Sequence, residues 1–171
     1  MKMRPFLIFA MLGLPIPTVA QEYQFEFDGA ASEQCLANIA PGQDVRSCYG
    51  QAANHCMEEN EGGFTTAGMS VCLNQGLRYW DRRLNAAYRS VSAQAGKIDH
   101  ELQELGSAVF SQKEALQAMQ RSWITFRDDA CEYERSTWGN GTGGGPAALL
   151  CHLNLTADQA LRLETRLADG Q

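Results

Sequence analysis

Apolar residues recur at steps of three and four over a long stretch that begins near residue 66. The stripe consists of Met69, Cys72, Leu73, Gly76, Leu77, Trp80, Leu84, Ala87, Tyr88, Val91 and Ala95. Charged side chains such as Arg78 and Arg82 lie between these positions. This spacing places the apolar side chains on one face of an α-helix. It predicts an amphipathic helix of about eight turns, which ends at a break over residues 96–99.

A second apolar stripe follows the break and predicts a second long helix. Its members are Leu102, Leu105, Val109, Leu116, Met119, Trp123, Phe126, Ala130 and Tyr133. The stripe ends near Trp138, where Gly139 begins a glycine-rich segment. Two long helices joined by a short break predict an antiparallel helical hairpin. We expect one apolar cluster between its two arms, made of Trp80, Leu84, Tyr88, Trp123 and Phe126.

Shorter helices are predicted on both sides of the hairpin. One covers residues 32–40, and Asp44 can cap a second that runs to about residue 59, because its carboxylate can accept hydrogen bonds from first-turn amides. Pro146 predicts a short helix over 146–153, and Thr156 with Gln159 fits a capping box for a last helix over 157–168. The predicted fold is all-α, with one domain over residues 32–171 and no repeat or linker.

The six cysteines form three pairs, and helix-breaking residues lie midway within each pair. The pairs are Cys35 with Cys48, Cys56 with Cys72, and Cys131 with Cys151. A bond between Cys48 and Cys56 is disfavoured, because eight positions of helix separate them by roughly 12 Å. Three disulfides that staple neighbouring helices are therefore expected. The alternative is zinc, because His55 adjoins Cys56 and His152 adjoins Cys151, although no C-x-x-C spacing supports it.

The first twenty residues have the features of a secretory signal peptide. Lys2 and Arg4 precede an apolar stretch over residues 6–14, and small residues end at Ala20. The apolar stretch is shorter than the ~20 residues of a membrane span. We expect cleavage after residue 20, a flexible mature N-terminus over 21–31, and a periplasmic or secreted bacterial protein in which disulfides persist.

The charge of the chain limits its partners. The formal net charge is −6, and it becomes −8 when the leader is removed with Lys2 and Arg4. A field of this sign does not attract nucleic acid, and it favours a basic partner. Asp128 and Asp129 point about 100° apart on a helix, so they do not flank one bond. The sequence predicts no enzyme, no cofactor and no metal site.

The second half carries an ordered set of motifs. They are Met69-Ser70-Val71-Cys72, Trp80-Asp81-Arg82-Arg83-Leu84-Asn85-Ala86-Ala87-Tyr88, Met119-Gln120-Arg121-Ser122-Trp123-Ile124-Thr125-Phe126-Arg127-Asp128-Asp129-Ala130-Cys131, Gly141-Thr142-Gly143-Gly144-Gly145-Pro146, and finally Cys151 with Leu155-Thr156. This order resembles the lysozyme inhibitor LprI N-terminal domain family over about residues 56–167. One departure is that an arginine that the family often has near residue 158 is replaced here by Asp158, with arginines only at Arg162 and Arg166.

The resemblance implies an exported protein, and the family's name implies inhibition of lysozyme. We interpret the motif residues as structural: Trp80, Asp81, Leu84, Asn85, Tyr88, Trp123, Phe126, Arg127 and Asp128. Arg127 can pair with Asp81 or Asn85 across the hairpin and so set the register of the two arms. Alternatively, Arg127 is a clamp for an anion.

Two exposed turns, each closed by an expected disulfide, are the candidate partner-binding segments. They contain the acidic residues Glu58, Glu59 and Glu61 and the loop residues Asn140, Gly141, Thr142 and Gly143. A stapled loop is suited to entering a cleft, and plain connections are the simpler interpretation of both turns. The sequence thus predicts a monomeric binding protein that blocks a basic lysozyme-type hydrolase. The alternative is a structural or accessory envelope protein that binds another exported protein.

Overall fold

The computed structural model describes residues 25–107 and 110–169, so the expected leader lies outside the described part of the chain. Its elements are α1 (Ala30–Asn38), a 3₁₀ turn η1 (Val45–Cys48), α2 (Gln51–Glu59), α3 (Thr66–Glu104), α4 (Gln112–Ser136) and α5 (Gly144–Ala168). Across these described ranges there is no strand. The predicted all-α class is confirmed.

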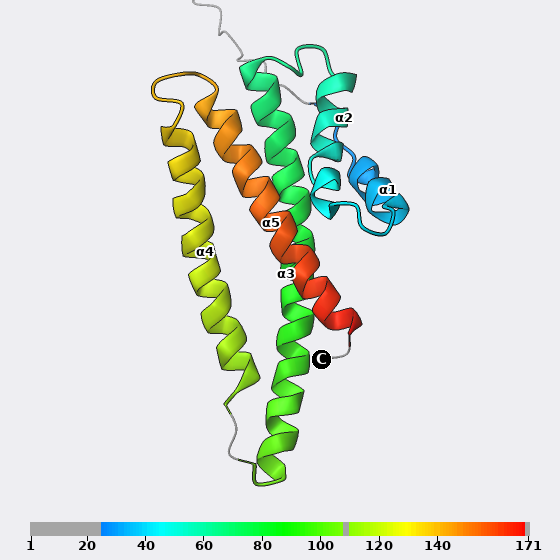
Figure 1. The fold of residues 1–171 in the computed structure, drawn as a ribbon, viewed down its shortest axis with the longest axis vertical. Helices are drawn as coiled ribbons and strands as arrows, with labels where there is room; N and C mark the ends of the chain where they lie inside the picture. Colours follow the sequence, from blue (N-terminus) through cyan, green and yellow to red (C-terminus); the bar gives the residue numbers. More distant parts are fainter. Residues whose placement is uncertain (1–24, 108–109, 170–171) are drawn as a thin grey trace, which may run out of the picture.

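Helix α3 is the longest helix and runs along the length of the molecule (Figure 1). Helix α4 runs antiparallel to it, which confirms the long hairpin, and α1 and α2 lie on the other side of the N-terminal half of α3. Helix α5 starts beside the end of α4 and crosses α3 at an angle. Most of the packing of α3 is against α5 rather than against α4, so the hairpin is filled by a third long helix.

The predicted break over residues 96–99 is wrong, because α3 continues through Gly96 to Glu104. Glycine in a helix costs only ~1 kcal/mol relative to alanine. The second arm begins instead at Gln112, where the Ser111 hydroxyl accepts from the Glu114 amide at 3.1 Å. The Asp99 carboxylate adds contacts to the Ser111 hydroxyl at 2.7 Å and to the Gln112 amide at 2.7 Å. These hydrogen bonds fix the start of α4 against α3. The Lys113 amide, which donates to Asp99 Oδ2 at 3.0 Å, and then the Ser111 and Gln112 donors hold the pKa of Asp99 below its ordinary value.

The two short C-terminal helices of the sequence analysis are one continuous helix, α5. Thr156, the predicted cap, lies in the middle of it and is fully buried. Leu153, Ala157 and Ala160 on the same helix are also fully buried. Burial of this continuous face outweighs a local capping signal, because most helix stability in proteins comes from tertiary packing.

All three expected disulfides are present. They are Cys35–Cys48, Cys56–Cys72 and Cys131–Cys151, with Cα–Cα distances of 5.4, 5.6 and 5.4 Å. The first joins α1 to η1, the second joins α2 to α3, and the third joins α4 to α5. The N-terminal helices and the adjoining ends of α4 and α5 are therefore covalently restrained.

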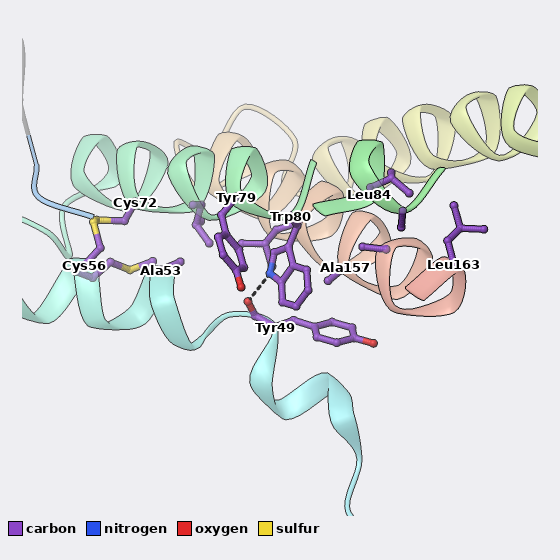
Figure 2. Packing of buried hydrophobic residues seen from close by; sticks show 14 of the residues in the cluster. Tyr49, Ala53, Cys56, Cys72, Tyr79, Trp80, Leu84, Ala157 and Leu163 are labelled. Carbon is purple, nitrogen blue, oxygen red and sulfur yellow. Dashed lines mark hydrogen bonds between the residues drawn. A yellow bond between two sulfur atoms is a disulfide. The ribbon is translucent and has the colours of Figure 1, made fainter. Parts of the chain in front are cut away.

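The centre of the core is Trp80, which is fully buried (Figure 2). Its indole Nε1–H donates to the Tyr49 carbonyl oxygen at 2.9 Å. The Tyr49 and Tyr79 rings meet it edge-on, with centroids 5.6 and 5.2 Å away. The Arg83 guanidinium lies 4.7 Å above the indole and is bonded to Glu164 of α5. Trp80 thereby links η1, α3 and α5.

Gly76 explains how three helices approach one another near Trp80. A Cβ at Gly76 would lie 2.7 Å from Leu153 Cδ1 and 3.3 Å from the Ala53 Cβ. The missing side chain therefore leaves room for α2 and α5 against α3. The small residues of α5 also allow the helix backbones to approach closely.

The predicted apolar cluster is only partly correct. Trp80 and Leu84 are buried, and Tyr88 and Trp123 pack against the core while partly exposed. Phe126 is 60 % exposed and does not belong to the cluster. Of the residues of α4, only Cys131 is buried, because α3 packs mainly against α5 and leaves most of α4 at the surface.

Replacing Trp80 with alanine should lower the free energy of unfolding by about 3–5 kcal/mol, because the substitution leaves a large cavity and removes a buried hydrogen bond. Phe126→Ala is the matched control, and we expect a change within about 0.5 kcal/mol for an exposed ring. Urea unfolding followed by far-ultraviolet circular dichroism measures both. Equal losses in the two variants would contradict the observed burial.

Thr156→Val should stabilise the protein by about 1 kcal/mol. The Thr156 hydroxyl is buried and has no hydrogen-bond partner among the described residues, and valine has nearly the same shape. Thr125→Val on the exposed face of α4 is the control and should change little. Thermal melting compares the variants, and a destabilised Thr156→Val protein would mean that the hydroxyl has a bonded partner.

Candidate functional site

The acidic turn between α2 and α3 is a well-formed connection. The Gly63 amide donates to the Asn60 carbonyl at 2.9 Å, and Gly62 has a φ of 76°, which favours glycine. Glu58, Glu59 and Glu61 are exposed. None of the three makes an ion pair with another described residue. Their charges are free to act on a partner.

A recess of about 510 Å³ lies beside this turn, between residues 26–28 and α2. Its walls include three carboxylates, from Glu26, Asp28 and Glu59, and the His55 ring. The Asn60 side chain holds the segment in place, because it donates to the Glu26 carbonyl at 3.1 Å and accepts from the Glu26 amide at 3.2 Å.

Sequence reasoning missed the contribution of Glu26 and Asp28, because it assigned residues 21–31 to a flexible segment. Residues 21–24 lie outside the described part of the chain. Phe25 and Phe27 pack against the core. The alternation of these rings with acidic residues was the signal that could have placed the segment on α2.

Residues 25–63 concentrate the negative charge of the protein. They contain seven acidic side chains and one basic one, Arg46. Arg46 is itself paired with Asp158 of α5 at 3.2 Å. The formal charge of this unit, −6, equals that of the whole chain. We call residues 25–63 the acidic unit.

The glycine-rich loop between α4 and α5 is braced from within. Its amides make short-range bonds, from Gly141 to the Trp138 carbonyl at 3.0 Å and from Gly144 to the Gly141 carbonyl at 3.2 Å. The Trp138 ring lies against Gly143, where a Cβ would collide with it. The side chains of Asn140 and Thr142 are exposed and have no hydrogen bond within the described residues. Cys131–Cys151 closes the base of the loop.

Both candidate segments lie at the same end of the molecule (Figure 1). The acidic turn leads into α3, and the glycine-rich loop joins α4 to α5 at that end. The structure therefore places at one end of the molecule two segments that are about 80 residues apart in the chain. It leaves them on different sides of α3.

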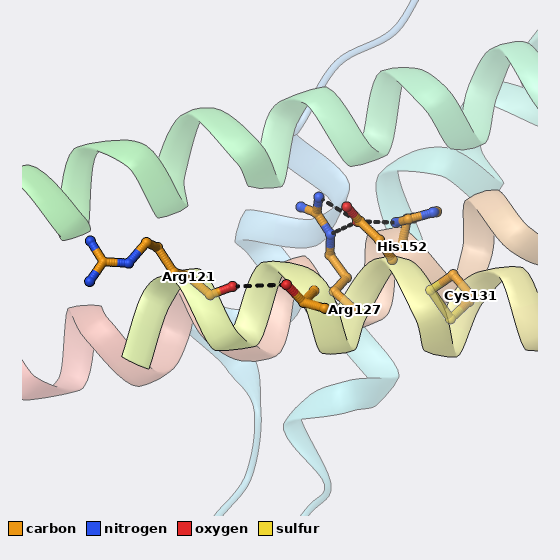
Figure 3. A network of polar contacts seen from close by, with 7 residues as sticks. Arg121, Arg127, Cys131 and His152 are labelled. Atoms are coloured by element: carbon orange, nitrogen blue, oxygen red, sulfur yellow. Dashed lines mark hydrogen bonds and ion pairs between the residues drawn. A yellow bond between two sulfur atoms is a disulfide. The ribbon is translucent and has the colours of Figure 1, made fainter. Parts of the chain in front are cut away.

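A polar network beside the Cys131–Cys151 bond involves Arg127 (Figure 3). Arg127 Nε and Nη2 donate to Asp128 Oδ1 at 2.9 and 2.8 Å, and the guanidinium lies 5.0 Å above the Trp123 ring. His152 of α5 approaches the same Asp128 oxygen at 3.9 Å. Because Asp128 already neutralises Arg127, the arrangement does not offer an open anion clamp.

The predicted pairing of Arg127 with Asp81 or Asn85 is wrong. Asn85 Nδ2 donates to Asp81 Oδ2 at 2.9 Å within α3. Arg127 finds its acid one residue away on its own helix. Asp128 lies within 2.8 Å of the guanidinium on the same helix, and α3 packs more against α5 than against α4.

The zinc alternative has no thiolate ligands here, because every cysteine is in a disulfide. Within residues 25–107 and 110–169, no three His, Cys, Asp or Glu side chains are grouped closely enough to hold a metal ion. None of the helices in that part of the chain combines the length and the apolar character needed to cross a bilayer.

We expect the pKa of His152 to lie below its ordinary value of 6.5. Partial burial is the main cause of the lowered pKa, and the positive charge of Arg127 is the next. The negative charge of Asp128 acts in the opposite direction and raises the pKa. Titration by NMR measures this pKa, and Arg127→Gln should raise it. The unfolded protein, in which the imidazole has its ordinary pKa, binds a proton at a higher pH than the folded protein does. Protonation of His152 should therefore lower the free energy of unfolding as the pH falls below about 6.5. A pKa above 6.5 would contradict the observed environment.

The chain has two curated relatives of uncharacterised function. The uncharacterised 17.7 kDa protein in the puhA 5′ region of Rhodobacter capsulatus is 24 % identical over 165 residues, which cover 96 % of both chains. An uncharacterised protein of Rhizobium meliloti is 39 % identical over 64 residues, which cover 37 % of this chain and 46 % of that protein. No solved structure matches significantly.

A family model matches the chain over residues 56–163 and is described as lysozyme inhibitor LprI. The matched region is more than half of the chain. It begins at the Cys56–Cys72 disulfide and includes the Cys131–Cys151 disulfide, the acidic turn and the glycine-rich loop. The chain belongs to the lysozyme inhibitor LprI family.

Proposed function

We propose that the protein is an exported inhibitor that binds a basic, lysozyme-type cell-wall hydrolase. The observation that carries this proposal is the family match over residues 56–163, which spans the packed α3, α4 and α5 and both stapled turns. The family's description supplies the class of partner. The charge and the loops described above supply a physical means of binding it.

Export is supported by the cysteine chemistry. Three disulfides, with no free cysteine, suit an oxidising compartment, because thiols in the cytosol are kept reduced. The proposed leader over residues 1–20 would deliver the chain to the periplasm or the medium, where cell-wall hydrolases act.

The acidic unit is the proposed first contact. Its charge of −6 attracts a basic protein and speeds encounter, and this effect weakens with salt. The recess beside Glu59 presents three carboxylates, which suits a lysine or arginine side chain of the partner. The position of the acidic unit at one end of the molecule would orient the approach.

The glycine-rich loop is the proposed second contact. Its internal hydrogen bonds and the disulfide at its base mean that little conformational freedom is lost on binding. Asn140 and Thr142 would supply uncharged polar contacts to a cleft. Weak contacts of this kind contribute affinity when the loop is already ordered.

A second candidate function is an accessory role in the envelope, through another exported protein. The observation that favours it is the exposure of large rings on α4, with Phe126 60 % and Tyr133 71 % exposed. Such rings are typical anchors of protein interfaces. Affinity capture from a periplasmic extract distinguishes the roles, because an accessory protein should retain a partner that is not a hydrolase.

The oxidised protein should slow the turnover of cell-wall substrate by lysozyme, and inhibition should weaken as salt rises. A turbidity assay with a fixed amount of lysozyme and increasing amounts of the protein measures this. The reduced and alkylated protein is the control, because it lacks the braced turns. Unchanged turnover at a large molar excess would rule out lysozyme itself as the target.

Reversing the charge of Glu58 and Glu59 to lysine should slow association about tenfold at low salt and flatten its salt dependence. Glu101→Lys with Glu104→Lys is the matched control, because these exposed glutamates lie at the far end of α3 and the net charge changes equally. Surface plasmon resonance measures both. Equal effects would mean that net charge, rather than the acidic turn, determines the rate.

Replacing Asn140 and Thr142 with alanine should leave the melting temperature unchanged and raise the dissociation rate from lysozyme. The reason is that both side chains are exposed and unbonded within the described residues, so they serve contact rather than folding. The same binding experiment provides the measurement. Unchanged dissociation would move the second contact away from this loop.

A further inference from the structure

A second recess lies at the opposite part of the molecule from the acidic turn, in the half where α3 and α4 converge. It is formed where the C-terminal part of α5 meets α3 and α4, and it has a volume of about 530 Å³. Apolar side chains from all three helices line it, including Ile98, Leu116, Met119 and Leu163. We call this recess the three-helix groove.

Two arginines of α5, Arg162 and Arg166, complete the wall of the three-helix groove. They are four residues apart, so they lie on the same face of the helix and repel one another. Neither makes a hydrogen bond or an ion pair with any described residue. Both are exposed. Arg83, by contrast, is paired with Glu164 at 2.6 Å.

Two carboxylates near the groove, those of Glu164 and Asp99, are bonded to other groups and do not pair with these arginines. Glu164, between the two arginines in sequence, is bonded to Arg83. Asp99 is occupied by the Ser111 hydroxyl and the amides of Gln112 and Lys113. In a protein whose net charge is −6, the groove is therefore a local cationic site beside an apolar surface.

The size of the groove selects the kind of occupant. A helix 10–12 Å wide fills about 500 Å³ per turn, so a helical peptide would fit for only one turn. Small-molecule sites cover roughly 300–1,000 Å³ and are mainly apolar with a few polar groups. The groove has both of these properties, and residues of α3, α4 and α5 form its walls.

We propose that the three-helix groove binds a single-chain amphiphile with an anionic head, such as a fatty acid. The acyl chain would lie against Ile98, Leu116 and Met119, and the carboxylate would be held by Arg162 and Arg166. Guanidinium groups suit this role because their donors match a carboxylate in geometry and charge. The apolar wall removes the chain from water. This site is separate from the surface of the proposed inhibitor.

The test is isothermal titration of the purified exported protein with laurate below its micelle concentration. We expect one laurate per protein. Arg162→Gln with Arg166→Gln should weaken binding at least tenfold. Arg78→Gln with Arg82→Gln is the matched control, because this is an exposed arginine pair at the same spacing on α3 and outside the groove. This control should bind laurate as the parent protein does.

A second variant tests the apolar part of the site. Ala115 is exposed and lines the groove, so Ala115→Trp should fill the groove without disturbing the core and should abolish laurate binding. Dodecanol should bind more weakly than laurate, because it lacks the charge, and inorganic phosphate alone should not bind, because it lacks the chain.

The proposal is overturned if laurate does not bind, or if the two arginine-pair variants bind it equally. It is also overturned if dodecanol binds as tightly as laurate, or if an acidic amphipathic peptide binds the groove in an arginine-dependent way while laurate does not. Lysozyme turnover in the presence of each variant is a separate measurement. If the protein does not inhibit lysozyme, the proposed inhibitory function is wrong, and the proposal that the three-helix groove binds laurate is not affected.

Discussion

The contact between α3 and α5 is the constraint on which the rest of the structure depends. Gly76, Ala157 and Ala160 leave room for the two helices to approach closely, and Leu153 fills the space that Gly76 leaves. Trp80 then extends this contact to η1 through its hydrogen bond to Tyr49. Helix α4 packs more against α5 than against α3, and Phe126 on α4 is exposed to solvent.

The disulfides restrain the parts that this contact does not reach. Residues 25–63 form only short helices, and Cys35–Cys48 and Cys56–Cys72 tie them together and to α3. Cys131–Cys151 holds α4 to α5 at the end where the glycine-rich loop emerges. Closing such loops reduces the freedom of the unfolded chain. The same bonds keep both turns ordered in the native protein, which favours binding.

Charge is divided along the molecule in a way that agrees with the two proposed sites. The acidic unit lies at one end of α3, and the three-helix groove with Arg162 and Arg166 lies toward the other. Exposed charges separated by more than ~10 Å are largely screened at ordinary salt. Each end can therefore act on its own partner, a basic protein or an anionic amphiphile, in spite of the net negative charge.

The sequence by itself determined the helical class, the three disulfide pairs and the acidic turn, because periodicity, cysteine spacing and charge are local properties. It did not reveal that α5 is one continuous helix. The local sequence around Thr156 indicated the start of a new helix, whereas burial of the surrounding face, which keeps the helix continuous, depends on tertiary packing. The pairing of Arg127 with Asp128, the recess beside Glu26 and the three-helix groove arise from contacts between distant segments. Only tertiary packing decides such contacts, because they depend on which helix buries which face.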